Sequence, residues 1–200
     1  LTLTLTNSGY SQVYDGDAAA DITPAWSFNG FISGDTSATI AYTGRNYNTA
    51  NVTTANLITV SGLSITSVAG GNSSAPEDYV LDSTTKTVNA TITPKTVSLA
   101  VAPKVYDAST DMTGYVSITT GVGGETLTYN GATSNDAHVA TADKYLNAIT
   151  LGNASDGSGG LASNYQLPTL NAANALVTIN PKTLTLTLTN SGYSQVYDGD

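Results

Sequence analysis

The chain has 200 residues, with 15 acidic against 6 basic side chains and a net charge of −9, so it lacks the Lys and Arg clusters that neutralise nucleic-acid phosphates or anionic lipids. It has no cysteine, which excludes disulfides and cysteine-ligated metals, and no apolar run of about 18 residues that could cross a bilayer. We therefore expect no nucleic-acid partner and no membrane insertion of this segment.

The predicted elements are nearly all strands. The alternation LTLTLT over residues 1–6 places Leu on one face and Thr on the other, the period of a half-buried strand. Runs rich in Val, Ile, Thr and aromatic residues, separated by turn residues, predict further strands at 11–14, 25–31, 38–43, 57–66, 79–82 and 87–93. About seven short strands in roughly 90 residues is the spacing of a sandwich.

The predicted fold class is all-β, built from tandem small β-sandwich (Ig-like) domains. The alternative is a pair of β-grasp-like domains, each with one short helix. Residues 136–151 could form a helix on propensity, but the corresponding stretch 51–63 is dense in Thr, Val and Ile. We therefore predict strand for both stretches.

The sequence repeats at two periods. Residues 184–200 reproduce residues 1–17, LTLTLTNSGYSQVYDGD, without a substitution, so the longer period is 183 residues. At about half that period, Ile92-Thr93-Pro94-Lys95 returns as Ile179-Asn180-Pro181-Lys182, and Val13-Tyr14-Asp15-Gly16 returns as Val105-Tyr106-Asp107-Ala108. We predict a first repeat domain at 1–96, a second at 97–183, and the first strands of a third, truncated repeat at 184–200.

The predicted boundaries leave almost no linker, because an alternating strand begins directly after each Pro-Lys-Thr. We expect the domains to be held end to end with limited bending. Residues 184–200 lack the rest of their domain, so we expect them to be mobile or to pair with the exposed edge of a neighbouring molecule.

These repeated segments resemble the YDG and related MBG-type repeat domains of large bacterial secreted adhesins of the filamentous-haemagglutinin type. The resemblance rests on residues 13–17 (VYDGD), 34–35 (GD), 78–81 (DYVL) and 92–95 (ITPK), whose counterparts follow in the same order in the second unit. It implies an extracellular structural repeat that is secreted or carried on a bacterial cell surface. The second unit has Ala108 in place of Gly16, so the sequence alone does not require a left-handed backbone there.

Calcium is the metal that this acidic composition favours, because hard cations take carboxylate and carbonyl oxygens. The candidate ligands recur at equivalent positions of the two units: Asp15, Asp17 and Asp21 in the first, and Asp107 and Asp111 in the second. Aspartates in turns more often bond their own backbone, and no twelve-residue calcium loop is present. We therefore predict no cofactor, with Ca²⁺ as the weaker alternative.

We expect no enzyme activity and assign no catalytic or cofactor-binding residue. The single histidine, His138, lies in a polar turn region, whereas acid–base or nucleophilic catalysis needs a positioned base beside a nucleophile. Aromatic side chains of the first unit could stack on sugar rings, but aromatics at strand alternation are more often core residues. The candidates are Trp26, Phe28, Phe31, Tyr42 and Tyr47.

The leading functional hypothesis is a structural spacer or stalk repeat of a bacterial cell-surface or secreted adhesin, which extends a binding region from the surface. The alternative is that the repeats themselves bind glycan or host protein weakly and multivalently. The expected partners are neighbouring repeats of the same chain and, under the alternative, a glycan or a host surface protein.

Overall fold

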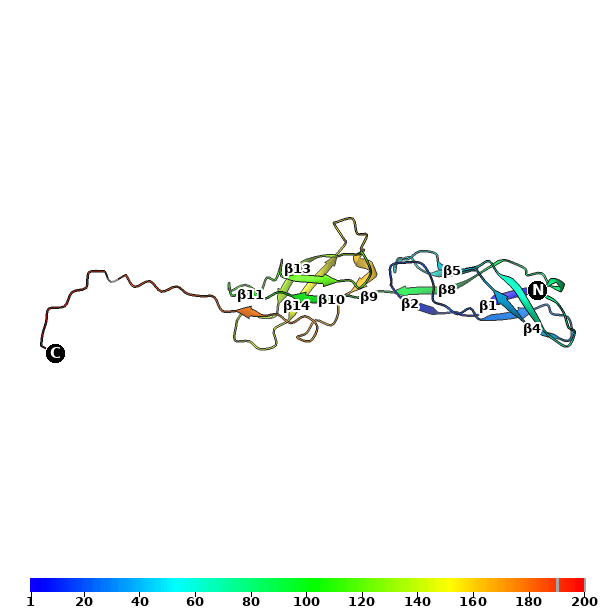
Figure 1. Cartoon of the computed structure of the whole chain (residues 1–200), viewed down its shortest axis with the longest axis horizontal. Helices are drawn as coiled ribbons and strands as arrows, with labels where there is room; N and C mark the ends of the chain where they lie inside the picture. The colour runs from blue at the N-terminus through cyan, green and yellow to red at the C-terminus, as the bar shows by residue number, and fades with distance from the viewer. Residues whose placement is uncertain (190, 200) are drawn as a thin grey trace.

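The computed structural model describes residues 1–189 and 191–199. Two β-rich bodies lie in line along the long axis, with the N-terminus at one end and residues 184–189 and 191–199 extending from the opposite end (Figure 1). We call residues 1–96 the first unit, 97–183 the second unit and 184–200 the tail.

The first unit consists of short strands and one 3-10 turn. They are β1 (Thr2–Leu5), β2 (Tyr10–Val13), β3 (Trp26–Asn29), β4 (Asp35–Ala41), β5 (Gly44–Tyr47), β6 (Leu57–Ser61), β7 (Ser64–Gly70), the turn η1 (Pro76–Asp78) and β8 (Thr85–Thr93). A four-stranded sheet has the order β2-β8-β6-β5, and β1–β3 and β4–β7 form antiparallel pairs. The β2–β8 pair is parallel.

The core of the first unit follows from strand alternation. Leu3 and Leu5 are buried on β1 while the intervening Thr side chains are exposed, as the LTLTLT pattern predicts. They belong to one hydrophobic cluster with Ile58 and Val60 of β6, which are fully buried. The cluster thus joins β1 to the four-stranded sheet, and the sandwich-like core lies between them.

The second unit repeats this framework. Its elements are β10 (Ser98–Val101), β11 (Lys104–Val105), β12 (Val116–Thr119), β13 (Thr128–Ser134), β14 (Leu146–Gly152), the 3-10 turn η2 (Ala162–Asn164), β15 (Tyr165–Gln166) and β16 (Ile179–Asn180). The connecting strand β9 (Lys95–Thr96) is the last element of the first unit. The antiparallel pair β10–β12 corresponds to β1–β3, and the parallel pair β11–β16 corresponds to β2–β8. A second cluster, which includes Met112 and Leu146, forms its core.

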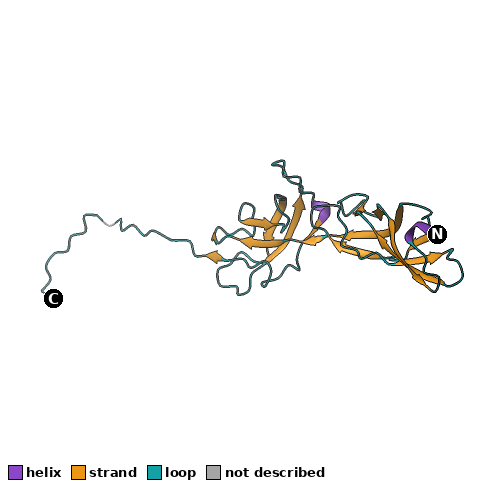
Figure 2. Ribbon diagram, turned by 45° about the vertical axis from the view of Figure 1, so that its right-hand side comes forward, coloured by secondary structure: helices purple, strands orange, loops and turns teal. Residues whose placement is uncertain are grey.

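The all-β prediction is confirmed, since strands dominate both units (Figure 2). Within the described ranges the only helical elements are the single 3-10 turns η1 and η2. The β-grasp alternative, which requires a helix across the sheet, is therefore not what these residues form.

Several predicted strand boundaries are wrong, each because a turn intervenes. The strand predicted at 57–66 is two strands, β6 and β7, separated by Gly62 with φ +66°. The strands predicted across 51–63 and 136–151 start only at Leu57 and Leu146, because the preceding residues form turns. The first of these turns is closed by a hydrogen bond from the Thr54 amide to the Asn51 carbonyl (3.1 Å).

Two further differences concern residues 79–82 and β5. The strand predicted at 79–82 is absent, although its counterpart in the second unit forms β15. β5 is an additional strand that the sequence patterns did not indicate.

The tail contains no strand in its described residues, and Leu184, Leu186 and Leu188 are exposed. Asn190 and Asp200, which belong to the predicted third repeat, lie outside the described residues.

Candidate functional site: the junction between the units

The Tyr-Asp-Gly turn that follows β2 is organised by its own aspartates. Asp15 accepts a hydrogen bond from the Asp17 amide (3.2 Å), and Asp17 accepts one from the Ala19 amide (2.7 Å). Gln12, on β2, donates its side-chain amide to Asp15 (2.8 Å), and its carbonyl oxygen accepts the Asp21 backbone amide (3.0 Å). The three candidate calcium ligands of the first unit therefore lie in one turn, which the hydrogen bonds of Gln12 stabilise.

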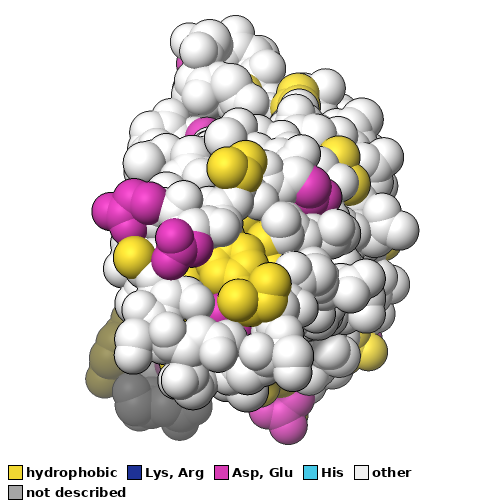
Figure 3. Space-filling model, turned by 90° about the vertical axis from the view of Figure 1, so that its right-hand side faces the viewer, with side chains coloured by type: hydrophobic (Ala, Val, Ile, Leu, Met, Phe, Trp, Pro, Cys, Tyr) yellow, Lys and Arg dark blue, Asp and Glu magenta, His cyan; other side chains and the backbone are white. Residues whose placement is uncertain are grey.

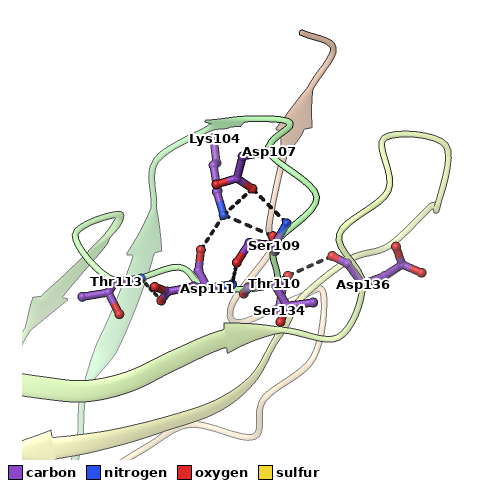
Figure 4. Close-up of polar contacts among 8 residues, drawn as sticks. All are labelled: Lys104, Asp107, Ser109, Thr110, Asp111, Thr113, Ser134 and Asp136. Carbon is purple, nitrogen blue, oxygen red and sulfur yellow. Dashed lines mark hydrogen bonds and ion pairs between the residues drawn. The ribbon is translucent and has the colours of Figure 1, made fainter.

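The second unit builds the same turn around a lysine (Figure 4). Lys104, at the position of Gln12, is 3% exposed, and its ammonium lies 2.9 Å from Asp107 Oδ1 and donates to the carbonyls of Asp111 (2.7 Å) and Ser109 (3.1 Å). The hydrogen bond from Lys104 lowers the pKa of Asp107 below its usual range. Asp111 in turn accepts the Thr113 amide (2.9 Å).

Four of the five candidate carboxylates thus already receive protein donors: Asp15, Asp17, Asp107 and Asp111. In the second unit the Lys104 ammonium is itself a cation among a carboxylate and two carbonyls. Within the described part of the chain, no group of three or more His, Cys, Asp or Glu side chains is placed to hold a metal ion. The calcium hypothesis for Asp15, Asp17, Asp21, Asp107 and Asp111 stays a prediction.

Both copies of the turn use a left-handed residue. Gly16 has φ +99°, and Ala108 keeps φ +67° despite its Cβ atom. The turn therefore has the same backbone sense in both units, which the Gly-to-Ala replacement left open at the sequence level.

A tyrosine–glutamate–tyrosine cluster joins the two units at this turn. Tyr14, directly after β2, donates to Glu125 Oε1 (2.6 Å), and Tyr165, on β15, donates to Glu125 Oε2 (2.7 Å). The two tyrosine rings meet edge to face with centroids 5.3 Å apart. One carboxylate of the second unit is therefore shared between a buried tyrosine of each unit.

The electrostatics of the cluster keep both hydroxyls protonated as donors. Burial, followed by the hydrogen bond to Glu125, raises the pKa of Tyr14 to about 12. The same two causes raise the pKa of Tyr165. Hydrogen bonds from neutral hydroxyls to a carboxylate are charge-assisted, so each is stronger than an ordinary neutral pair.

A second set of contacts surrounds Asn164, which is 1% exposed at the end of η2. Its side-chain oxygen accepts the Val52 amide (3.0 Å), and its side-chain amide donates to Asn51 Oδ1 (3.0 Å). Both partners belong to the first unit, so Asn164 is hydrogen-bonded across the junction to the turn that precedes β6.

The connecting residues are part of the second unit's own β-structure. Lys95–Thr96 (β9) pairs in parallel with Tyr165–Gln166 (β15), and the Val97 amide continues the pairing to the Gln166 carbonyl (3.0 Å). A chain segment held by strand hydrogen bonds on both sides of Thr96 cannot act as a free hinge.

Apolar contact is continuous through the junction. The hydrophobic cluster of the first unit includes Val97 and Tyr165, and further side chains of the second unit pack against it: Leu99, Ile118, Val122, Leu127, Leu151 and Leu167. The approach is close at Gly16, where an added Cβ would lie 2.7 Å from Val122 Cγ1. A Cβ atom at that position would therefore require Val122 to shift.

The other sequence candidates lie away from any clustered chemistry. Trp26 and Phe28 are half-buried and pack against the first cluster, and Tyr47 is buried with its hydroxyl on the Thr91 carbonyl (2.9 Å). His138 is exposed and stacks on Tyr106 at a centroid distance of 6.1 Å. No helix in the described residues is long and apolar enough to cross a membrane.

Comparison with known proteins places the first unit in a family. Residues 1–88 match the model of the YDG domain. The first unit contains a YDG-type domain. No curated protein and no solved structure matches the chain. The YDG-type match ends before β9, so the junction residues of the second unit lie beyond it.

Sequence reasoning did not identify Glu125, Asn164 and Tyr165 as a site. The signal was present, because Gly124-Glu125 and the Asn-Tyr of residues 164–165 are among the segments that recur in both units. What the repeat pattern could not give is the pairing of these residues with Tyr14 and Asn51, more than 100 residues earlier in the chain.

Proposed function

We propose that this chain is a structural spacer from the stalk of a secreted or bacterial cell-surface adhesin, and that it carries no enzyme activity. Three observations support this assignment. They are the resemblance of the repeats to adhesin YDG and MBG-type domains, the YDG-type match, and the exact recurrence of residues 1–17 at residues 184–200. A stalk gains reach from copy number, which suits a sequence duplicated without change.

The observation that carries the proposal is the junction. Three kinds of contact restrain bending at this point. They are the strand pairing of the connecting residues, the Glu125 carboxylate shared by both units, and a hydrophobic cluster to which both units contribute. Domains that merely follow one another along a chain usually move relative to each other, and an apolar, hydrogen-bonded interface is what suppresses this motion. A spacer that must hold a binding region away from a surface needs this stiffness.

The rigidity is tested by a distance distribution between spin labels on the two units. The chain has no cysteine, so Thr4→Cys on β1 and Thr119→Cys on β12 place a unique pair at exposed positions. We expect a single narrow distribution. Adding Glu125→Ala leaves two buried tyrosine hydroxyls without their acceptor and should broaden it. A broad distribution without Glu125→Ala would contradict the spacer role.

The competing function, weak multivalent adhesion by the repeats, is tested by a glycan array and by capture on host-cell surface protein with the 200-residue chain immobilised at high density. A spacer retains nothing above an unrelated acidic β-protein. Retention that survives at physiological salt would support adhesion in place of the spacer.

A further inference from the structure

The N-terminal end of the first unit is built like the N-terminal end of the second unit, which is the end that contacts the first unit at the junction. We propose that this end, the leading face (Ile32, Asp35, Asp78, Tyr79 and Val80), docks a preceding repeat unit with the sequence of residues 97–183. The proposal rests on the spacer function and names the partner of a surface to which no partner is assigned.

The chain enters both units in the same way. The Leu1 ammonium donates to the Val80 carbonyl (2.6 Å), as the Val97 amide donates to the Gln166 carbonyl (3.0 Å). Val80 and Gln166 each follow the tyrosine that comes directly after η1 or η2. Leu1 therefore occupies the place that Val97 occupies in the second unit.

The same acid–tyrosine pair lies beside each entry point. Asp35 Oδ2 accepts the Tyr79 hydroxyl (2.6 Å), as Glu125 Oε2 accepts the Tyr165 hydroxyl (2.7 Å). Glu125 uses its other oxygen for Tyr14 of the first unit, whereas Asp35 Oδ1 is buried and has no hydrogen-bond partner among the described residues. A buried carboxylate oxygen without a donor is costly, and the other oxygen, Oδ2, already accepts both the Tyr79 and the Ser74 hydroxyls.

The strand edge at the leading face is unpaired. Tyr165–Gln166 form β15 because Lys95–Thr96 pair with them, but Tyr79–Val80 form no strand. The residues that precede a copy of Leu1 are known from this chain itself, since Lys182–Thr183 come directly before residue 184. We therefore pair Tyr79 and Val80 with Lys182 and Thr183 of the preceding unit, in the register of β15 and β9.

The leading face is also apolar. Val80 is 79% exposed and Ile32 is 60% exposed, and a hydrophobic patch lies near the centre of this end of the molecule (Figure 3). Ile32 precedes Asp35 by the same spacing as Val122 precedes Glu125, so Ile32 corresponds to Val122. In the observed junction Val122 packs against the hydrophobic cluster of the first unit.

The far end of the second unit presents the complementary groups. Tyr106, Val139 and His138 correspond in sequence to Tyr14, Val52 and Asn51, the residues with which the first unit meets the second. Val139 and His138 are exposed. This correspondence places Tyr106 beside the Asp35–Tyr79 pair and His138 beside Asp78, the counterpart of Asn164.

The two kinds of junction differ in their side chains. Ala108 and Ile32 are each one carbon larger than Gly16 and Val122, and Asp35 is one carbon shorter than Glu125. The array therefore alternates two junctions that share strand pairing but pack differently. This alternation agrees with a period of two units, because each unit must match different neighbours at its two ends.

The test uses the 200-residue chain extended after Asp200 with residues 18–96, which completes a copy of the first unit behind the second. Hydrogen exchange then compares the amides of residues 80 and 81 in the leading copy with the same amides in the following copy, because the Tyr79 and Asp82 amides already donate within the first unit (3.3 and 3.0 Å). We expect exchange at least ~10-fold slower in the following copy, because its strand edge is paired. Equal rates in the two copies would overturn the proposal.

Ile32→Asp provides the matched variant. In the leading copy Ile32 is exposed, so the substitution should leave exchange and unfolding unchanged. In the following copy it places a charge in the new junction and should return the amides of residues 80 and 81 to the fast rate of the leading copy. A variant without effect in either copy would overturn docking at this face.

Failure here is distinguishable from failure of the spacer function. If the copies exchange alike while the spin-label distance across the first junction stays narrow, the leading face has no partner and the spacer role stands. If the following copy is protected but the chain is retained by glycan or host protein, docking stands and the spacer role does not.

Discussion

Residues 1–17 and 184–200 have the same sequence, yet the described residues of the second copy differ in structure from the first. In the first unit Leu3 and Leu5 are 1% and 7% exposed on a paired strand, whereas Leu186 and Leu188 of the tail are 97% and 86% exposed. β1 is paired by β3 and packs into a shared hydrophobic cluster, and the tail lacks the corresponding segments. The difference shows that alternation makes a strand possible, while the partner strand and core make it form.

The same lesson applies to residues 79–80 and 165–166. Both pairs follow a 3-10 turn and begin with a tyrosine bonded to an acidic side chain, yet only the second pair is a strand. Its partner strand, Lys95–Thr96, is supplied by the connecting residues.

The largest expected effect is at the buried leucine. Leu3→Ala should destabilise the first unit by about 2–5 kcal/mol, because it removes a buried side chain and leaves a cavity. Leu186→Ala is the matched control at the same position of the repeated sequence and should change stability by less than ~0.5 kcal/mol. Urea unfolding monitored by Trp26, the single tryptophan and the partner of Leu5 on β3, measures both. Equal effects would mean that the tail is packed in solution.

The next effect concerns the junction tyrosine. Tyr14→Phe removes one of the two donors to Glu125 and should cost about 1–3 kcal/mol, since a part-buried carboxylate oxygen loses its charge-assisted hydrogen bond. Tyr197, the same residue of the tail, is 88% exposed, so Tyr197→Phe should be neutral. The Trp26 unfolding midpoint reports the first cost, and the spin-label distance across the junction should broaden only in Tyr14→Phe. An unchanged midpoint would mean that the cluster adds no stability.

A smaller effect is expected at the glycine of the turn. Gly16→Ala places a Cβ atom 2.7 Å from Val122 Cγ1 and should cost about 1–2 kcal/mol. Gly199, its copy in the tail, has φ +90° and nothing within 4 Å of an added Cβ, so Gly199→Ala carries the backbone change without the contact. Since Ala108 already adopts a left-handed φ, a cost confined to Gly16→Ala isolates packing across the junction.

Much of the fold could be predicted because its signals are local. Alternation located β1, and the Gly, Asn and Asp clusters located most turns. The split of 57–66 was missed because Gly62 stands between two strands of the same composition. β5 was missed because Gly44-Arg45-Asn46-Tyr47 has little strand propensity and forms a strand by pairing with β6.

The junction could be predicted only in part. The short connection between the Pro-Lys-Thr and the next strand indicated limited bending, which stays a prediction; the pairing of β9 with β15 is a contact that the sequence did not indicate. The Glu125 cluster was beyond reach, because it brings together residues that no short motif links. The role of Lys104 was equally hidden, since a lysine in an alternating strand is ordinarily exposed.

The final prediction is that the first unit loses stability at high pH through Tyr14. The matching tyrosine of the tail, Tyr197, should have no such effect. Burial and the Glu125 hydrogen bond raise the pKa of Tyr14 from 10.0 to about 12 in the folded protein. The unfolded chain therefore loses this proton first, and stability that is fully present below about pH 10 falls as the pH rises toward 12. Tyr47, whose pKa burial raises to about 12, contributes in the same direction.

Urea unfolding at Trp26 between about pH 9 and pH 12 measures this loss. Tyr14→Phe should reduce the dependence of the unfolding free energy on pH above pH 10, because one of the linked protons is removed. Tyr197→Phe should leave that dependence unchanged, since the tail has no packed core to lose. If Tyr14→Phe and the unsubstituted chain lose stability equally steeply, the Tyr14 hydroxyl is not buried at the junction, and the cluster around Glu125 does not hold the two units together in solution.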